Sequence, residues 1–263
     1  MLVIQIYADN PLRNFNYLIA CPSSREALVV DPLDVTRCLA AAKQHGLKIT
    51  KILNTHEHWD HIDGNEEMRR HTGARLYAHN GAMGVIDHVD VGLYAGDTIA
   101  VGQSIKLKVL DTPGHTRSHV CLLANSAVPG LFCGDTLFNA GAGNCHNGGN
   151  VDDLYDTFSQ QLAKLPDNTK IYPGHDYILT NLKFTLDREP GNRAAEDMLN
   201  MLQDHDPHNA YITTMAEERR INSFFRLDSP VIIDKLKSED PDFSAAPSPR
   251  DVFTALRARR NTW

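Results

Sequence analysis

The residues with the clearest chemical potential stand in one short segment of the 263-residue chain, which reads THEHWDH from Thr55 to His61. His56, His58, Asp60 and His61 follow an apolar run, and a turn at the end of that run can aim them into one cleft. Imidazole and carboxylate together suit zinc, iron and manganese, and the lack of cysteine disfavours a closed structural zinc site. Because clustered histidine and aspartate mark metal or catalytic sites, the HxHxDH spacing predicts a metal site.

Three later residues of the same kind each follow an apolar run and a glycine: His115 in TPGHT, Asp135 in GDT and His175 in PGHD. Singly, each could be a turn or capping residue, since Asp and His are common in turns. Jointly with the first segment they make seven ligands, which is too many for one tetrahedral ion and suits two ions that activate water for hydrolysis. We expect Asp135 to bridge the two ions, one held by His56, His58 and His115 and the other by Asp60, His61 and His175.

Strands must position most of these ligands, because the chain up to about residue 176 alternates short apolar runs with turns. Strand runs with only occasional helices favour two sheets with helices outside and not a doubly wound parallel sheet. The predicted strands cover residues 2–7, 16–21, 27–31, 49–54, 75–78, 104–111, 119–124, 130–133 and 170–172, and the predicted helices cover 35–45, 66–71 and 153–164.

The pattern changes after residue 176, where helical periodicity is interrupted by breaks rich in Pro, Gly and Asp. The fold class expected is therefore α+β, with a catalytic domain at 1–176 and a small all-helical domain at 177–263. The predicted helices of this second domain cover 177–187, 193–205, 214–222, 230–237 and 250–260, with a polar, proline-rich surface loop at 238–249.

Composition limits the class of partner. Lys and Arg (26) are outnumbered by Asp and Glu (33), and a net charge of −7 argues against nucleic acid, which usually requires a basic patch. No apolar run approaches the roughly 20 residues of a membrane helix, and the first residues carry no basic leader typical of a signal peptide. The cysteines are odd in number (5) and lack CxxC spacing, which favours inert thiols in a reducing cytoplasm. We therefore expect a cytoplasmic protein without a nucleic-acid or membrane partner.

The motif THEHWDH, followed by TPGHT, GDT and PGHD, resembles the metallo-β-lactamase superfamily. The resemblance implies an αββα sandwich with the metal ions at one edge of the two sheets. The superfamily includes thioesterases, lactonases, β-lactamases, nucleases and dioxygenases, so the motif alone does not choose the substrate.

The rest of the chain is similar to the glyoxalase II (hydroxyacylglutathione hydrolase) family, through GDTLFNAGAG (134–143), PGHDYILTNLKFTLDREPGN (173–192), TMAEERRINSFFR (214–226) and PRDVFTALRARRNTW (249–263). The resemblance implies a small-molecule thioester substrate, S-(2-hydroxyacyl)glutathione, cleaved to glutathione and a 2-hydroxy acid. It implies two divalent ions, zinc first with iron or manganese as alternatives, and a hydroxide oriented by Asp60 and Asp135. Tyr177 would hydrogen-bond the glutathione, and Arg257 and Arg260 would face its carboxylate end, from a helical domain that binds the substrate.

One loop departs from the family pattern. Members often carry a basic residue and an aromatic residue after the GDTLF segment, and here Asn144 and His146 stand in those places. Losing a cation there removes a charge-assisted contact worth about 1.5–3 kcal/mol. A related hydrolase that acts on the thioester of another thiol carrier, or on a lactone, is therefore the first alternative function. An iron persulfide dioxygenase is a second alternative, which the helical domain and the full ligand set disfavour, and a non-catalytic metal-binding protein is a third. Cys145 lacks a recognisable base partner for a nucleophile's role.

Overall fold

The computed structural model describes all 263 residues and places the strands in two facing sheets. The first sheet has the order β1-β2-β3-β4-β5-β6, antiparallel from β1 to β3 and parallel from β3 to β6. Parallel pairing of β3 with β4 puts the carboxyl ends of both strands at one edge of the sheet. The strands are β1 (Leu2–Tyr7), β2 (Phe15–Ala20), β3 (Glu26–Val30), β4 (Lys48–Leu53), β5 (Arg75–His79) and β6 (Val91–Leu93).

The second sheet has the order β13-β10-β9-β8-β7, and only β10 and β13 are parallel in it. Their parallel pairing again brings two carboxyl ends together, with Gly134 opposite Pro173. A two-stranded hairpin, β11 with β12, follows β10 directly. These strands are β7 (Thr98–Val101), β8 (Ile105–Asp111), β9 (Val120–Ala124), β10 (Gly130–Gly134), β11 (Leu137–Phe138), β12 (Gly141–Ala142) and β13 (Lys170–Pro173).

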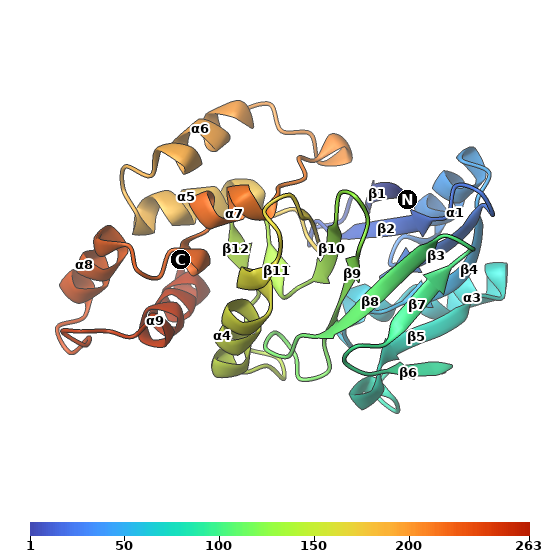
Figure 1. The fold of residues 1–263 in the computed structure, drawn as a ribbon, viewed down its shortest axis with the longest axis horizontal. Helices are drawn as coiled ribbons and strands as arrows, with labels where there is room; N and C mark the ends of the chain where they lie inside the picture. Colours follow the sequence, from blue (N-terminus) through green and yellow to red (C-terminus); the bar gives the residue numbers. More distant parts are fainter.

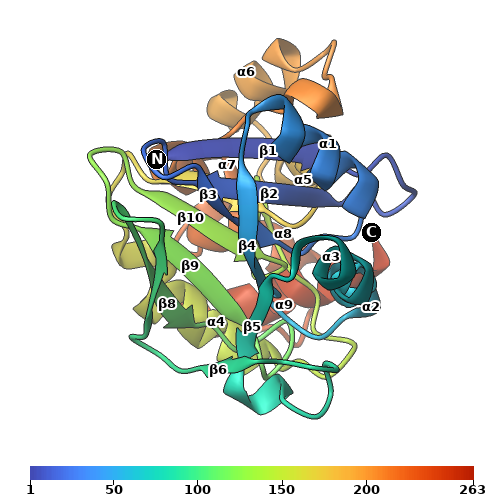
Figure 2. The same ribbon diagram turned by 90° about the vertical axis from the view of Figure 1, so that its right-hand side faces the viewer.

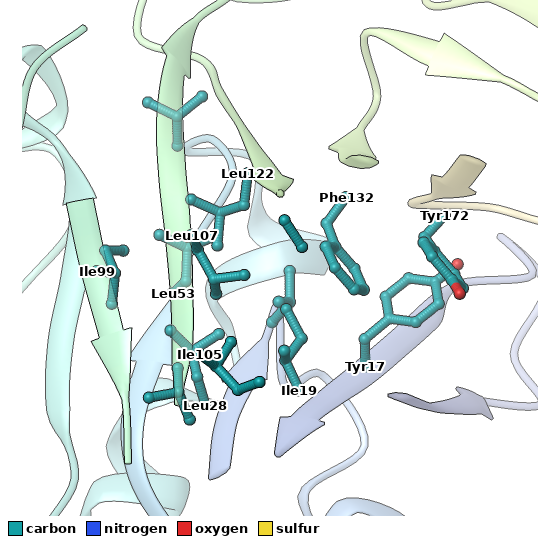
Figure 3. Close-up of a cluster of buried hydrophobic side chains, with 14 of the residues drawn as sticks. Tyr17, Ile19, Leu28, Leu53, Ile99, Ile105, Leu107, Leu122, Phe132 and Tyr172 are labelled. Atoms are coloured by element: carbon teal, nitrogen blue, oxygen red, sulfur yellow. The ribbon is translucent and has the colours of Figure 1, made fainter. Parts of the chain in front are cut away.

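The two sheets face each other across one hydrophobic core, to which both contribute alternate side chains (Figure 3). Tyr17 and Leu28 come from the first sheet, and Phe132 and Tyr172, stacked at 4.7 Å, come from the second. Helices α1 (Val35–Gln44) and α3 (Asn65–Thr72) cover the outer face of the first sheet (Figure 2). The sequence pattern predicted this arrangement of two sheets with helices outside, and the structure confirms it.

The outer face of the second sheet is covered by α4 (Val151–Gln160) and by the helices that follow β13 (Figure 1). A cluster of 18 buried residues joins side chains of β9, β10 and β13 to side chains of these helices, so the sheet and the helical region share one core. The later helices are α5 (Ile178–Arg188), α6 (Arg193–Met201), α7 (Met215–Ile221), α8 (Pro230–Glu239) and α9 (Pro249–Thr262).

The helical periodicity after residue 176 is confirmed by these five helices, and the loop predicted at 238–249 lies between α8 and α9. Capping residues define several helix starts: the side chains of Thr214 and Ser248 form capping boxes for α7 and α9. The division into domains at 176/177 stays a prediction. No helix in the structure combines the length and the apolar character needed to cross a bilayer.

The elements missing from the sequence prediction are the shortest ones. They are strands β6, β7, β11 and β12, and the single turn α2 (Trp59–Ile62). Strands β11 and β12 have two residues each, too few for an alternating pattern to show. The sequence analysis missed the turn α2 because the THEHWDH segment has no apolar stripe. This turn places Asp60 and His61 in a helix.

Candidate metal centre

The first histidine cluster consists of His56, His58 and His115. Two of them follow β4 of the first sheet and the third follows β8 of the second sheet, so both sheets contribute to the cluster. The Nδ1 atom of His58 lies 3.1 Å from Nε2 of His56 and 2.9 Å from Nε2 of His115. His56 and His115 are buried and His58 is partly exposed, which leaves this cluster open on one side.

The second cluster consists of Asp60, His61 and His175. Helix α2 supplies the first two side chains, and the turn after β13 supplies the third. The Nε2 atoms of His61 and His175 lie 3.3 Å apart, and Oδ2 of Asp60 lies 3.5 Å from the former and 3.4 Å from the latter. All three residues are buried.

Asp135, at the end of β10, lies between the two clusters. Its Oδ2 is 3.1 Å from Nε2 of His175 and 3.6 Å from Nε2 of His115, and its Oδ1 is 3.4 Å from Nε2 of His61. Close packing holds it there, since a Cβ on Gly174 would come within 2.3 Å of Oδ1. The structure thus brings together all seven residues that the sequence singled out, in the two groups expected, with Asp135 between them.

The donor atoms fit a pair of divalent ions. Ligand atoms around a tetrahedral zinc ion at 2.0–2.1 Å lie ~3.3 Å from one another, close to the 2.9–3.1 Å found in the first cluster and the 3.3–3.5 Å found in the second. In the first cluster, imidazole nitrogens face one another, and three lone pairs in contact repel unless a cation lies among them. Oδ1 of Asp135 is buried and accepts no hydrogen bond, so it also lacks the partner that a cation would supply. The His and Asp clusters are therefore consistent with a dinuclear metal site.

Protonation favours metal binding in the first cluster. Burial lowers the pKa of His56 well below its usual value and that of His115 to about 4, so both imidazoles keep a free lone pair at neutral pH. Burial would raise the pKa of Asp135, but the neighbouring His175 and His61 outweigh it and hold that pKa well below its usual value. The bridging carboxyl group is therefore an anion.

A buried aspartate that the sequence analysis missed, Asp31, orients ligands on both sides of the site. It stands just after β3, beside the end of β4. Its Oδ1 accepts from the Thr55 backbone N–H at 2.8 Å, and its Oδ2 accepts from the Thr55 hydroxyl at 2.7 Å and lies 2.9 Å from Nδ1 of His61. The Thr55 hydroxyl also lies 3.0 Å from Nδ1 of His56. An acidic residue closing an apolar strand, as in ALVVD, was the signal available.

Backbone carbonyl groups orient the remaining histidines. Nδ1 of His115 lies 2.7 Å from the Asn144 carbonyl oxygen, and Nε2 of His58 lies 3.0 Å from that of Asn147. Nδ1 of His175 lies 2.7 Å from the Leu12 carbonyl oxygen. Such partners fix the tautomer and the ring orientation of a metal-binding histidine. Every residue carries a backbone carbonyl group, so residue type offers no signal for these contacts.

Two family models divide the chain between them. The model described as Metallo-beta-lactamase superfamily matches residues 10–175, and the model described as Hydroxyacylglutathione hydrolase C-terminus matches residues 176–263. The chain is 57% identical to the hydroxyacylglutathione hydrolase of Nitrosococcus oceani, with both chains covered completely. The chain belongs to the hydroxyacylglutathione hydrolase (glyoxalase II) family.

A more distant relative carries the same name, and a solved structure shares the fold. The cytoplasmic hydroxyacylglutathione hydrolase of Arabidopsis thaliana is 33% identical over 95% of each chain. Among solved structures, ETHE1 from Myxococcus xanthus has a TM-score of 0.68 and 29% identity, with 100% of this chain and 99% of that chain covered. This member of the hydroxyacylglutathione hydrolase family therefore has both parts that the family models describe: the sandwich with its metal-binding motifs, and the helical region that follows it.

A cavity of about 230 Å³ adjoins the second cluster. Two of its walls, Phe138 and Tyr177, pack on the His175 ring with centroid distances of 5.8 Å and 5.0 Å. A larger hollow of about 510 Å³ lies between the α8–α9 loop and α9 and contains none of the residues near the ligands. The smaller cavity is lined by Phe138, Ala142, Asn144, His146, Tyr177, Asn181, Arg257, Arg260 and Asn261, which include all five residues predicted to bind substrate.

Two of these five have contacts within the protein that the sequence did not foresee. The Tyr177 hydroxyl donates to the Leu12 carbonyl oxygen at 2.9 Å, so its lone pairs remain for an incoming donor. Arg257 is buried and its Nη1 donates to the carbonyl oxygens of Ala142 at 2.7 Å and Gly143 at 3.1 Å. The guanidinium of Arg257 therefore supports the loop after β12 as well as lining the cavity.

The cavity carries uncompensated positive charge. Its lining contains no Asp or Glu, and neither arginine has a carboxylate partner, since Arg260 bonds only the Asn181 side chain, at 3.3 Å. Burial lowers the pKa of Arg257 to about 10 and the adjacent Arg260 adds to the effect, which leaves both guanidinium groups charged at neutral pH. An anionic ligand would relieve their mutual repulsion.

Proposed function

We propose that this protein hydrolyses the thioester bond of S-(2-hydroxyacyl)glutathione, S-D-lactoylglutathione above all, to glutathione and a 2-hydroxy acid. The observation that carries the proposal is the juxtaposition of a seven-ligand metal site with an arginine-lined cavity, joined through the Tyr177 ring on His175. Relatives named for this reaction support it at 57% identity over the whole chain.

The side chains of the site suit attack by water on a thioester carbonyl. Divalent ions held by the seven ligands would polarise that carbonyl and lower the pKa of a water molecule. Zinc is the ion we propose, with iron or manganese as alternatives, because neutral imidazole and carboxylate suit all three. Asp60 and Asp135 would accept a hydrogen bond from the attacking water and so orient it. The thiolate leaves as a stable anion near neutral pH, since a thiol has a pKa of about 8.5.

The cavity would hold the glutathione moiety. Arg260 and Arg257 present positive charge to its carboxylate end, and the Tyr177 hydroxyl offers lone pairs to a peptide N–H. Asn144 and His146 also line the cavity and would make neutral polar contacts. Cys145 lies beside them, but burial raises the pKa of its thiol to about 11, so it is protonated and not a nucleophile.

The decisive test is thiol release from S-D-lactoylglutathione by the purified, zinc-loaded protein, followed with a thiol reagent. Rapid release that saturates with substrate is the expected result. Two bound zinc ions with no thiol released would refute glutathione as the carrier and direct the search to other thioesters and to lactones. The reaction would take place in the cytoplasm. The Arabidopsis relative is named as a cytoplasmic enzyme, and the five free thiols would stay reduced there.

A further inference from the structure

The loop between β1 and β2, residues 8–14, is joined to the turn that carries His175. The Phe15 backbone N–H donates to the Gly174 carbonyl oxygen at 2.7 Å, and the Asp176 N–H donates to that of Arg13 at 2.9 Å. Asn14 and His175 form an isolated antiparallel bridge between these contacts. The two segments, 163 residues apart in the sequence, therefore move as one unit.

This loop supplies the groups that orient two of the three ligands in the second cluster. The Leu12 carbonyl oxygen lies 2.7 Å from Nδ1 of His175. The Asn14 side-chain amide donates to Oδ2 of Asp60 at 3.0 Å and to the Asp60 carbonyl oxygen at 3.2 Å. A shift of this loop would turn both ligands away from the ion that they would hold, while no hydrogen bond joins the loop to His56, His58 or His115.

Arg13 holds the loop in a conformation that it would not adopt freely. Its φ angle is +61°, in the left-handed region that an arginine rarely occupies. Its Nε donates to the Asp176 carbonyl oxygen at 2.8 Å, and its Nη2 pairs with the Asp176 carboxylate. The side chain therefore compensates for the backbone strain by binding the turn that the loop serves.

Asp176 is itself fixed from the helical region. His205 follows α6, and its Nε2 lies 3.0 Å from Oδ1 and 2.9 Å from Oδ2 of Asp176. The side chains of His205 and Asp176 are only 3% and 2% exposed, so water competes little for these bonds. The segment after α6 reaches across to β1 (Figure 1). There the His208 ring packs edge-on against the Tyr7 ring.

We propose that His205, Asp176 and Arg13 form a clamp through which the helical region positions the second metal cluster. His205 is a positioning residue in this account, since it touches no ligand and acts through Asp176 and Arg13 on Leu12 and Asn14. This proposal rests on the proposed function, because it assumes that the site binds two metal ions. It assigns a role in metal retention to the segment between α6 and α7, beyond the substrate cavity formed by α5 and α9.

The test measures the two zinc dissociation constants of the full chain by competition with a chromogenic chelator. His205→Ala is expected to weaken one constant about tenfold, the lower end for groups that support metal ligands, and to leave the other within about twofold. kcat should fall with that constant and KM should stay, because the cavity is untouched. His205→Gln, which retains a donor for Asp176, should recover most of the loss. Gln203→Ala, an exposed residue of the same segment whose side chain makes no hydrogen bond, should change neither constant.

Arg13→Gly keeps the experiment decisive if His205→Ala fails to fold. Glycine accepts the positive φ angle, so this variant removes the guanidinium without adding backbone strain, and it should weaken the same zinc constant. Unchanged constants in the folded variants would overturn the clamp, as would an equal loss at both sites. A parent protein that binds two zinc ions but releases no thiol would refute the thioesterase alone, because the zinc constants still test the clamp.

Discussion

The two arginines of the cavity should fail in different ways when truncated. Arg257→Ala removes a buried guanidinium and three hydrogen bonds, to the carbonyl oxygens of Ala142 and Gly143 and to Oδ1 of Asn261. Hydrogen bonds to a charged group contribute about 1.5–3 kcal/mol each, and water entering the cavity would restore part of that. We therefore expect a loss of about 3 kcal/mol in the free energy of unfolding. Arg260→Ala removes a single 3.3 Å bond to Asn181 and should change stability by less than about 1 kcal/mol.

The kinetic effects should separate in the same way. Gly143 immediately precedes Asn144, whose carbonyl oxygen orients His115 at 2.7 Å. Loosening this loop should lower kcat and weaken zinc binding in Arg257→Ala, together with a higher KM. Arg260→Ala should raise KM about tenfold, which corresponds to about 1.4 kcal/mol for one charge-assisted contact, and should leave kcat within about twofold.

Urea unfolding, kcat and KM for S-D-lactoylglutathione, and zinc content should be measured on both variants and on Arg257→Lys. The lysine keeps the charge but not the planar fork, so its stability should lie between the parent and the alanine variant. A stable Arg257→Ala that changes only KM would refute the structural role assigned to this arginine. An unchanged KM in Arg260→Ala would refute the cavity as the glutathione site.

Two further predictions concern the metal ligands and a buried acid. His58→Ala and Asp135→Ala should each abolish thiol release and lower the zinc content. His71 is exposed on α3, so the control variant His71→Ala should change neither. Full activity in either ligand variant would exclude the metal assignment. Burial raises the pKa of Glu218 to about 7, so its folded form keeps a proton that the unfolded chain loses above about 4.5. The free energy of unfolding should therefore fall on the order of 3 kcal/mol as pH rises from about 4.5 to 7. Urea unfolding over this pH range should show a smaller fall in Glu218→Gln. An equal fall in the parent and in this variant would contradict the burial argument.

The sequence predicted the fold wherever an element is long enough for its periodicity to show. Runs such as ALVV in β3 and VCLLA in β9 are buried strands, and helices α5, α6 and α8 end within a few residues of a Pro, Gly or Asp break. The hairpin β11–β12 escaped because two-residue strands have no period, although it lies next to Asp135 and carries Phe138 into the cavity. Its position depends on tertiary contacts, such as the Glu218 carboxylate accepting from the Ala140 N–H at 3.0 Å.

The metal ligands could be read from the sequence because a ligand is a side-chain type, and seven such types at strand ends are improbable by chance. The groups that orient them are harder to foresee. Asp31 lies 30 residues from its partner His61, and only the parallel pairing of β3 with β4 makes them neighbours. Leu12 acts through a carbonyl oxygen, which every residue possesses. Such contacts follow from backbone placement, which residue type does not determine.

The loop after β12 shows why the departure at Asn144 and His146 need not disturb the metal site. The carbonyl oxygens of Asn144 and Asn147 orient His115 and His58, while the side chains of Asn144 and His146 line the cavity. Backbone atoms of this loop thus orient the metal-binding histidines, whereas its side chains contact whatever molecule occupies the cavity. A substitution that keeps the loop's backbone path, fixed by Arg257 on the carbonyl of Gly143, can change substrate contacts without moving either histidine. A complete ligand set and an altered cavity wall are therefore compatible in one enzyme, because they depend on different atoms of the same residues.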